Sequence, residues 1–274
     1  MTPEADPEGL EIRLLLEAIH ARYGFDLREY ATSSMRRRVR AALARSGLAH
    51  LGELQHLIVN EPSAFPAVLD DLTVRVTEMF RDPSFYRAFR QRVLPILRTY
   101  PLLKIWHGGC SSGEEAYASA ILLDEAGLYD RSQIYATDLN PGVLEHARQA
   151  VYNADRFELF CENYAKCGGG VALPTYVTHA YDQVAMRESL KRNILFFQHD
   201  LVTDHVFGEM HVIFCRNVFI YFGHRLRERV LEKFAQSLCP GGFLCLGSAE
   251  RLPTGSHLPF SEFAREERIY RYEG

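Results

Sequence analysis

A turn rich in glycine and serine, followed at once by two glutamates, has the clearest chemical potential in this sequence. It reads His-Gly-Gly-Cys-Ser-Ser-Gly-Glu-Glu over residues 107–115. Glycines between a strand and a helix let the backbone approach a ligand closely, and the free N–H groups of the helix start receive polar atoms. The spacing is Gly-Gly-x-x-x-Gly, which differs from the Gly-x-Gly-x-x-Gly of dinucleotide-binding turns.

The two glutamates indicate the charge of the ligand. Glu114 and Glu115 would repel a pyrophosphate, whereas a cationic ligand suits them. S-adenosylmethionine carries a sulfonium and an ammonium group and meets this requirement. The alternative is a tight turn that holds no ligand and precedes a solvated helix start.

Acidic residues end two further segments of strand character. Asp138 stands where nucleoside-binding sheets receive ribose hydroxyls. Alternatively, Asp138 or Asn140 caps a helix that begins at Pro141, and both roles are compatible. Asp200 would accept a hydrogen bond from an adenine amino group while Leu201 packs on the ring, or the pair is an ordinary strand end.

A fourth apolar strand is interrupted near its end by two polar residues. The segment 214–222 reads Phe-Cys-Arg-Asn-Val-Phe-Ile-Tyr-Phe, with the interruption at Arg216 and Asn217. Packing explains such residues poorly, so we interpret them as part of a site. The Cys-Pro-Gly-Gly segment 239–242 is interpreted as a structural turn between a helix and a strand.

These motifs need a sheet to bring them together. Short apolar segments at 102–107, 133–137, 193–198, 211–215 and 243–247 alternate with amphipathic helical segments at 114–125, 141–150 and 225–238. This alternation predicts an α/β fold, a doubly wound parallel sheet with helices on both faces. Ligands bind such sheets at the carboxyl ends of the strands.

The rest of the chain divides into three further parts. Residues 1–80 predict a helical N-terminal domain, with a second helix capped by Thr32 or Ser33. Asp82-Pro83 predicts the N-cap and first residue of a linker helix over 81–100. The sheet domain spans 101–274, and a glycine-rich stretch of weak strand character predicts an inserted β subdomain at about 155–190.

Composition excludes several classes of protein. The 274 residues are 47% hydrophobic and 24% charged, which is typical of a globular protein and argues against a disordered regulator. The net charge of -4 argues against binding polyanions with the whole surface. No apolar run reaches about 18 residues, and the start carries no hydrophobic stretch, so we expect a cytoplasmic protein without membrane insertion. The six scattered cysteines are interpreted as free buried thiols, since neither a disulfide framework nor a metal site is indicated.

Four segments together resemble the chemotaxis receptor glutamate methyltransferases, the CheR family. They are Val-Thr-Glu-Met-Phe-Arg-Asp-Pro at 76–83, Gly-Cys-Ser-Ser-Gly-Glu-Glu at 109–115, Ala-Thr-Asp at 136–138 and Cys-Arg-Asn-Val-Phe-Ile-Tyr-Phe at 215–222. The resemblance extends over nearly the whole chain. It implies a Rossmann-like methyltransferase sheet and S-adenosylmethionine as methyl donor, with S-adenosylhomocysteine as product. The acceptors would be glutamates in the cytoplasmic helical region of methyl-accepting chemoreceptors.

The resemblance also implies site residues. Glu115 would hold the amino-acid end of the cofactor and Asp138 the ribose, and Tyr221 would lie by the reacting methyl. We expect Arg81 and Tyr221 to orient the acceptor. The further cofactor-binding residues would be Thr77, Arg81, Gly109, Cys110, Asp200, Leu201, Asn217 and Val218. A basic helix would meet the receptor, unless its side chains are merely solvated, and its arginines are Arg36, Arg37, Arg38, Arg40 and Arg45.

Two departures from the family pattern keep a second interpretation open. Arg75 and Asp200 each replace a residue that is often asparagine in the family. They motivate the alternative of a catalytically weakened scaffold or sensor that binds S-adenosylmethionine. A nucleic-acid methyltransferase is disfavoured because the fourth strand lacks the Asn/Asp-Pro-Pro-aromatic sequence, and a nicotinamide dehydrogenase because the glycine spacing is wrong.

Overall fold

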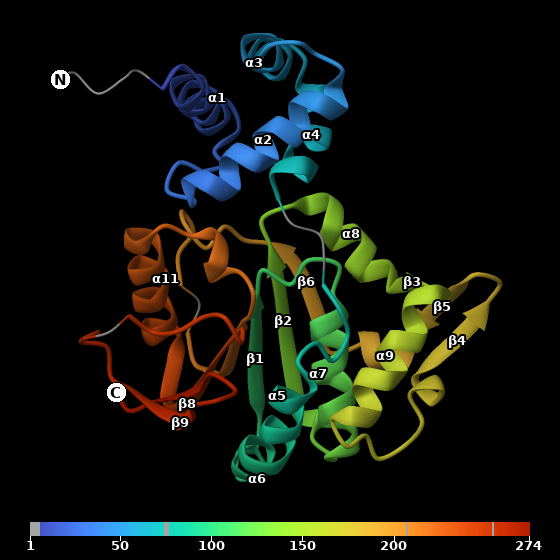
Figure 1. The fold of residues 1–274 in the computed structure, drawn as a ribbon. Coiled ribbons are helices and arrows are strands. Elements are labelled where there is room, and N and C mark those ends of the chain that lie inside the picture. Colours follow the sequence, from blue (N-terminus) through green and yellow to red (C-terminus); the bar gives the residue numbers. More distant parts are fainter. Residues whose placement is uncertain (1–5, 74–76, 207, 254) are drawn as a thin grey trace.

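The computed structural model describes residues 6–73, 77–206, 208–253 and 255–274. Helices come first along the chain, followed by a seven-stranded sheet and a separate three-stranded sheet (Figure 1). The predicted α/β class, with a helical N-terminal part and a small inserted sheet, is confirmed.

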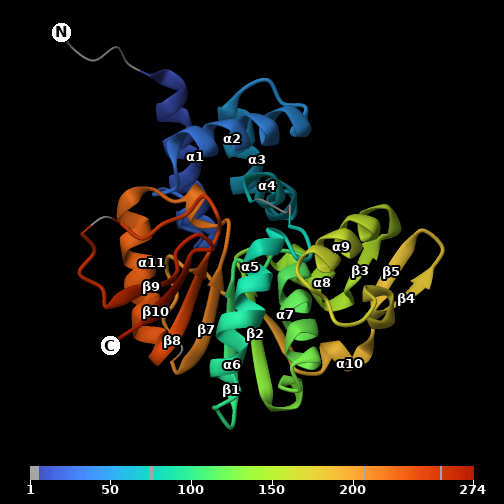
Figure 2. The ribbon, with the colours of Figure 1, turned by 60° about the horizontal axis from the view of Figure 1, so that its bottom comes forward.

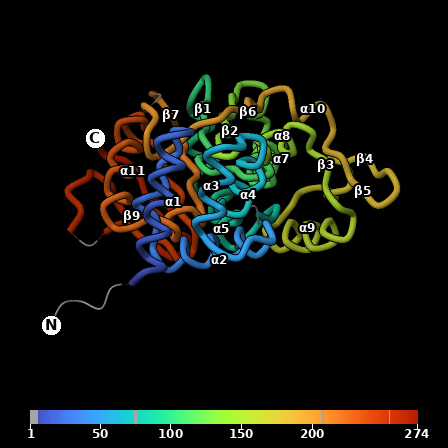
Figure 3. Tube along the Cα trace, turned by 90° about the horizontal axis from the view of Figure 1, so that it is seen from above, coloured from blue at the N-terminus to red at the C-terminus, as the bar shows by residue number. Residues whose placement is uncertain are grey.

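The N-terminal helices form their own hydrophobic core and lie across one end of the larger sheet (Figure 3). They are α1 (Pro7–Tyr23), α2 (Thr32–Ser46), α3 (Leu51–Asn60) and α4 (Phe65–Leu72). Gly24 and Gly47, both at positive φ, end α1 and α2. The N-cap residue of α2 is Ala31, which makes no side-chain cap, so the expected capping by Thr32 or Ser33 is wrong.

A helical connection leads into the sheet and packs against it. It consists of α5 (Pro83–Ala88), a π-helical turn (Phe89–Val93) and α6 (Leu94–Leu97). The Leu94 N–H bonds to the Phe89 carbonyl five residues back. Asp82 is the N-cap residue of α5 and Pro83 its first residue, as expected, but Asp82 has φ 59° and its side chain makes no capping hydrogen bond. Its carboxylate binds Arg216 instead, because a buried guanidinium needs a counter-charge.

The larger sheet has the strand order β6-β2-β1-β7-β8-β10-β9. Its parallel strands are β1 (Leu103–Gly108), β2 (Ser132–Asp138), β6 (Ile194–Gln198), β7 (Met210–Cys215) and β8 (Leu238–Leu246). Strands β9 (Phe260–Ala264) and β10 (Ile269–Tyr272) add an antiparallel edge that the sequence analysis missed. The order reverses between β1 and β7, which places a ligand crevice at their carboxyl ends.

Helices cover both faces of this sheet (Figure 2). Helices α5, α6 and α7 (Glu114–Glu125) share a core with Ile105, whereas α11 (His224–Ser237) packs on the opposite face with Trp106. Adjacent residues of β1 are therefore both buried, as is typical of a parallel sheet. Strand β8 begins at Leu238 with a register shift against β7, so the expected turn at 239–242 lies within an irregular strand start.

The inserted segment is a three-stranded antiparallel sheet with one long helix. Strands β3 (Val151–Asn153), β5 (Gln183–Met186) and β4 (Val177–Ala180) lie in that order. Helix α9 (Ala154–Lys166) follows β3, and the short α10 (Glu188–Lys191) leads back to the larger sheet. Helix α8 (Pro141–Gln149) precedes the segment and packs against β2 and β6.

Candidate functional site

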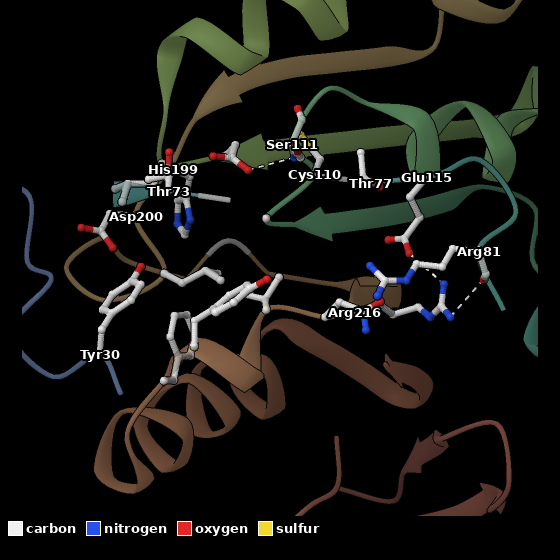
Figure 4. A pocket seen from close by; sticks show the side chains of 18 of the residues that line it. Tyr30, Thr73, Thr77, Arg81, Cys110, Ser111, Glu115, His199, Asp200 and Arg216 are labelled. Carbon is white, nitrogen blue, oxygen red and sulfur yellow. Dashed lines mark hydrogen bonds and ion pairs between the residues drawn. The ribbon is translucent and has the colours of Figure 1, made fainter. Parts of the chain in front are cut away.

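A pocket lies at the carboxyl ends of β1, β2, β6 and β7, beneath the N-terminal helices, and its empty space amounts to about 930 Å³ including its open mouth. Glu115, Arg81 and Arg216 lie at one end of the pocket, and Tyr30, His199 and Asp200 at the other (Figure 4). The pocket gathers every residue that the sequence analysis assigned to the cofactor or to catalysis. These are Thr77, Arg81, Gly109, Cys110, Glu115, Asp138, Asp200, Leu201, Asn217, Val218 and Tyr221.

Glu115 presents an oriented carboxylate at one end of the pocket. Its Oε1 lies 3.0 Å from His107 Nδ1, and its Oε2 lies 3.1 Å from Arg216 Nη1. Burial acts to raise the pKa of Glu115, but the His107 hydrogen bond and the Arg216 charge bring it below its ordinary value. The side chain is thus an anion at neutral pH, suited to an ammonium group.

Arg216 organises this end of the pocket, and the sequence analysis gave it no individual role. Its Nη2 lies 2.9 Å from Asp82 Oδ2, and its guanidinium carbon lies 4.0 Å from the centre of the Phe85 ring. Burial opposes the charge, yet the carboxylates of Glu115 and Asp82 and the nearby Tyr86 raise the pKa of Arg216. An arginine inside a buried apolar run requires anionic partners, and that signal was present in the sequence.

The glycine loop lines the pocket, and at Gly109 a side chain would clash with a neighbouring residue. Gly109 has φ +77°, and a Cβ atom there would lie 2.6 Å from Val218 Cγ2. Glycine therefore meets both the backbone conformation and the close approach. Burial raises the pKa of the neighbouring Cys110 thiol well above its ordinary value, so this cysteine stays neutral and is a poor nucleophile.

Asp138 is held by two backbone N–H groups. Its Oδ2 accepts from Ser111 N at 2.8 Å, and its Oδ1 accepts from Asn140 N at 3.0 Å. Burial raises the pKa of Asp138 despite these hydrogen bonds. Asn140 caps α8 by accepting from Gly142 N at 2.8 Å. Asn140 therefore supplies the cap, while Asp138 lines the pocket.

Asp200 serves a strand end and also lines the pocket. Its Oδ1 accepts from Val202 N at 2.7 Å and closes the turn after β6, and burial raises its pKa. Leu201 packs over Gly108, while Tyr30 reaches in from the N-terminal helices and contacts Phe222 at 5.2 Å between ring centres. Arg75, the other departure noted in the sequence, lies outside the described residues.

Arg38 lies inside the pocket, which differs from the exposed basic face expected for it. Its side chain is buried; Nη1 donates to the Leu72 carbonyl at 2.6 Å, and the guanidinium carbon lies 4.2 Å from the centre of the Tyr221 ring. Its buried Nη2 has no hydrogen-bond partner within the described part of the chain. An unused buried donor at the pocket wall is available to an acceptor atom of a bound ligand.

The other arginines of α2 lie outside the pocket lining, and three of them already have partners. Arg36 pairs with Asp6 and Glu8, Arg40 pairs with Glu8, and Arg45 pairs with Asp71. Arg37 is exposed. The protein's own carboxylates therefore partly neutralise this basic surface.

The residues present fit S-adenosylmethionine. An ionised carboxylate faces one end, and a second carboxylate stands at the tip of β2 where hydroxyl groups are received. Leu201 and Val218 add apolar surface, and the glycine loop leaves room for close approach. A doubly wound sheet with this pocket at its switch point defines the class of S-adenosylmethionine-dependent methyltransferases.

Comparison with known proteins gives the family. The CheR methyltransferase SAM-binding domain matches residues 75–268, and the CheR methyltransferase all-alpha domain matches residues 10–73. The chain belongs to the CheR methyltransferase family, which confirms the resemblance seen in the sequence.

Relatives match over most of their length. A Pseudomonas putida protein that carries the name methyltransferase Cher3 is 43% identical over 272 residues, covering 99% of each chain. A chemotaxis protein methyltransferase of Listeria monocytogenes is 29% identical over 231 residues, covering 84% of this chain and 85% of its own. Chemotaxis protein methyltransferase 1 of Pseudomonas aeruginosa is 29% identical over 241 residues, covering 82% and 83%.

Two negative findings apply to the described residues alone. Within them no helix has both the length and the apolar character to cross a bilayer. The same residues contain no cluster of three or more His, Cys, Asp or Glu side chains that could hold a metal ion.

Proposed function

We propose that the protein transfers the methyl group of S-adenosylmethionine to glutamate side chains in the cytoplasmic helical region of chemoreceptors. The products are glutamate methyl esters and S-adenosylhomocysteine. The observation that carries the proposal is one pocket with two opposite preferences. Glu115 and Asp138 suit the cofactor, whereas the buried Arg38 offers an unused donor beside Tyr221 to an anionic acceptor.

Each proposed cofactor contact follows from the charge or polarity of the wall. Glu115 would bind the ammonium group, and Asp138 would accept from the ribose hydroxyls. Leu201 and Val218 would pack on the adenine. The other residues proposed to contact the cofactor are Thr77, Arg81, Gly109, Cys110, Asp200 and Asn217.

The reaction requires little acid–base catalysis by the protein. A glutamate side chain has a pKa near ~4.3 and is already an anion at neutral pH, so no general base is needed. Bound S-adenosylmethionine supplies a methyl group activated by the sulfonium charge. The acceptor oxygen bonds to the methyl carbon as the carbon–sulfur bond breaks, and no proton moves. Alignment of such groups supplies roughly 7–11 kcal/mol in favourable cases.

The residues of this chain would provide that alignment. Arg38 would donate from Nη2 to the acceptor carboxylate, and its stacking on Tyr221 fixes where that donor stands. Tyr221 and Arg81 would orient the acceptor oxygen and the cofactor. The N-terminal helices form a roof over the pocket and would exclude water once the acceptor has entered.

The receptor would dock against α2. Arg36, Arg37, Arg40 and Arg45 lie on the same helix as Arg38, outside the pocket lining. Acidic receptor helices would meet this surface, while one glutamate side chain reaches Arg38. Such a contact would weaken with salt because the charges are exposed, whereas binding of the cofactor among the buried groups of the pocket would change little.

The test has two stages. Calorimetric titration with S-adenosylhomocysteine should show micromolar binding, and a receptor cytoplasmic domain should then acquire base-labile methyl groups from labelled S-adenosylmethionine. Arg81→Ala and Tyr221→Phe should each slow that transfer, and near-normal rates in both would remove these residues from the mechanism. Binding without transfer to any receptor domain would favour the scaffold alternative.

A further inference from the structure

The first helix of the inserted segment reaches two walls of the pocket, although no residue of it lines the pocket. Arg156 stands in the first turn of α9, three residues after the N-cap Asn153. Helical side chains lean toward the N-terminus of their helix. The Arg156 side chain thereby reaches the segment before α5 and the start of α7.

Arg156 bridges those two pocket walls. Its Nη2 donates to the Thr77 carbonyl, and its Nη1 lies 3.4 Å from Glu114 Oε1. Thr77 lines the pocket, and Glu114 directly precedes the cofactor-facing Glu115 in α7. One guanidinium therefore joins the backbone of a pocket-lining residue to the carboxylate that directly precedes Glu115.

The surroundings of Glu114 explain why a cation is needed. Its side chain is completely buried, and besides Arg156 it accepts from Ser112 Oγ at 2.7 Å. A buried carboxylate is costly without a counter-charge. Arg156 lies in the first turn of its helix, where a cation interacts unfavourably with the helix dipole. Its contacts with Glu114 and the Thr77 carbonyl offset that unfavourable interaction.

Two further contacts of the inserted segment reach the same walls. Tyr152 donates its hydroxyl to the Ser112 carbonyl at 3.0 Å, and Asn163 Nδ2 lies 3.4 Å from the Met79 carbonyl. Ser112 belongs to the glycine loop, and Met79 follows Thr77 by two residues. The inserted segment thus holds the glycine loop and the segment at 77–79 together from outside.

We infer that Arg156 is a positioning residue for the cofactor pocket, through which the inserted segment sets the affinity for S-adenosylmethionine. The inference rests on the proposed function. Arg156 acts on Thr77 directly, at its carbonyl, and on Glu115 through the neighbouring Glu114, and it touches neither cofactor nor acceptor. An ordinary surface arginine, 42% exposed like this one, would have almost no effect on ligand binding.

The experiment is a titration of variants with S-adenosylhomocysteine. Arg156→Ala should weaken binding about tenfold, because a charge-assisted hydrogen bond and an ion pair are lost. Arg156→Lys should recover part of the affinity, since one ammonium group keeps the charge near Glu114 but cannot span both partners. Lys166→Ala is the matched control, an exposed cation at the other end of α9, and should bind like the wild type.

Two more measurements separate positioning from general damage. At saturating cofactor the Arg156→Ala enzyme should keep kcat within about twofold while KM for S-adenosylmethionine rises about tenfold. In a Glu114→Gln background the effect of Arg156→Ala on affinity should shrink, because the carboxylate that it neutralises is gone. Thermal unfolding followed by Trp106 fluorescence checks the fold, and Arg156→Gln replaces the alanine variant if that variant does not fold.

The outcomes are distinct. Wild type and Arg156→Ala binding S-adenosylhomocysteine within twofold of each other would overturn the inference and leave the proposed function standing. Equal loss in Lys166→Ala would overturn it too, because any charge change on α9 would then suffice. Wild-type protein that binds no S-adenosylhomocysteine would overturn the proposed function, and the inference with it.

Discussion

Arg216 shows how one buried charge orders the end of the pocket that faces an ammonium group. A buried ion pair adds little to the stability of the fold, because desolvation offsets much of the attraction. The effect of Arg216 here is to hold neighbouring side chains in place. Two carboxylates and the Phe85 ring fix the guanidinium, which in turn fixes Glu115 Oε2 at 3.1 Å. The pocket therefore presents an oriented anion before a ligand arrives.

Asp138 leads to a prediction about pH. Burial raises its pKa above the ordinary 3.8, so the folded protein favours the protonated form. As the pH falls from neutral through that raised pKa, the carboxylate takes up a proton and loses its capacity to accept from two ribose hydroxyls. Affinity for S-adenosylhomocysteine should fall over this range, while protonation of Asp138 by itself makes the ligand-free fold more stable than it is at neutral pH.

Calorimetry across that pH range checks the Asp138 prediction. Asp138→Asn should bind about tenfold more weakly at neutral pH and should lack the decline on the acid side. The comparison variant is Asp200→Asn, whose residue also has a raised pKa and also accepts a backbone N–H, that of Val202, but is not proposed to bind the ribose. If the fall in affinity at acid pH persists in Asp138→Asn and vanishes in Asp200→Asn, Asp138 is not the residue that binds the ribose.

Helix α2 has a buried apolar face and an exposed basic face. Met35, Arg38, Val39 and Ala42 are buried and recur at helical spacing, so Arg38 occupies a position of the apolar stripe. The exposed arginines lie around it. An arginine in a buried stripe is the sequence signal by which Arg38 could have been assigned to the pocket.

Two acids at the start of α1 pair with arginines that we propose to bind the receptor. Asp6 and Glu8 pair with Arg36 and Arg40, which are the cations an acidic receptor helix would use. The double variant Asp6→Asn, Glu8→Gln should therefore methylate a receptor domain roughly two- to fivefold faster at low salt, as expected for losing exposed ion pairs. Initial rates below saturating receptor give the measurement.

Two comparisons make the α1 result specific. The gain should disappear at high salt, and affinity for S-adenosylhomocysteine should stay unchanged, because neither acid lines the pocket. Glu17→Gln is the matched variant on the same helix; its carboxylate pairs with Arg28, away from α2, and its rate should match the wild type. Equal or slower methylation by the double variant would show that these ion pairs do not oppose docking.

At the scale of the molecule, the features that could be predicted from the sequence are those that depend on a short stretch of residues. Five parallel strands, the glycine loop and the acidic strand tips follow from hydrophobic alternation and turn chemistry. The ion pair of Arg216 with Asp82 joins residues 134 positions apart, and no local pattern specifies it. The same holds for Arg38 beneath Tyr221 and for Arg156 on Thr77. The C-terminal hairpin β9–β10 was missed because its short strands alternate weakly.

The N-terminal helices and the sheet meet through a short backbone contact beside the pocket. Ala31 N donates to the Tyr221 carbonyl at 2.8 Å, and Gly223 N donates to the Glu29 carbonyl at 2.9 Å. Tyr30, between the two partners on the helical side, lines the pocket and contacts Phe222. A ligand that touches both walls would lose contacts with one of them if this backbone contact opened. Binding should therefore stabilise it.

Amide hydrogen exchange measures that coupling. With S-adenosylhomocysteine at about a hundred times its Kd, exchange at Ala31 and Gly223 should slow by up to about a hundredfold if both amides open with the ligand site. The hairpin of β4 and β5 does not line the pocket, and its amides serve as the internal reference. Protection confined to the glycine loop, with Ala31 and Gly223 unchanged, would mean that the helices lift from the sheet while the ligand stays bound. The N-terminal helices would then contribute to binding of the acceptor alone, and the residues of the sheet domain would determine the affinity for the cofactor.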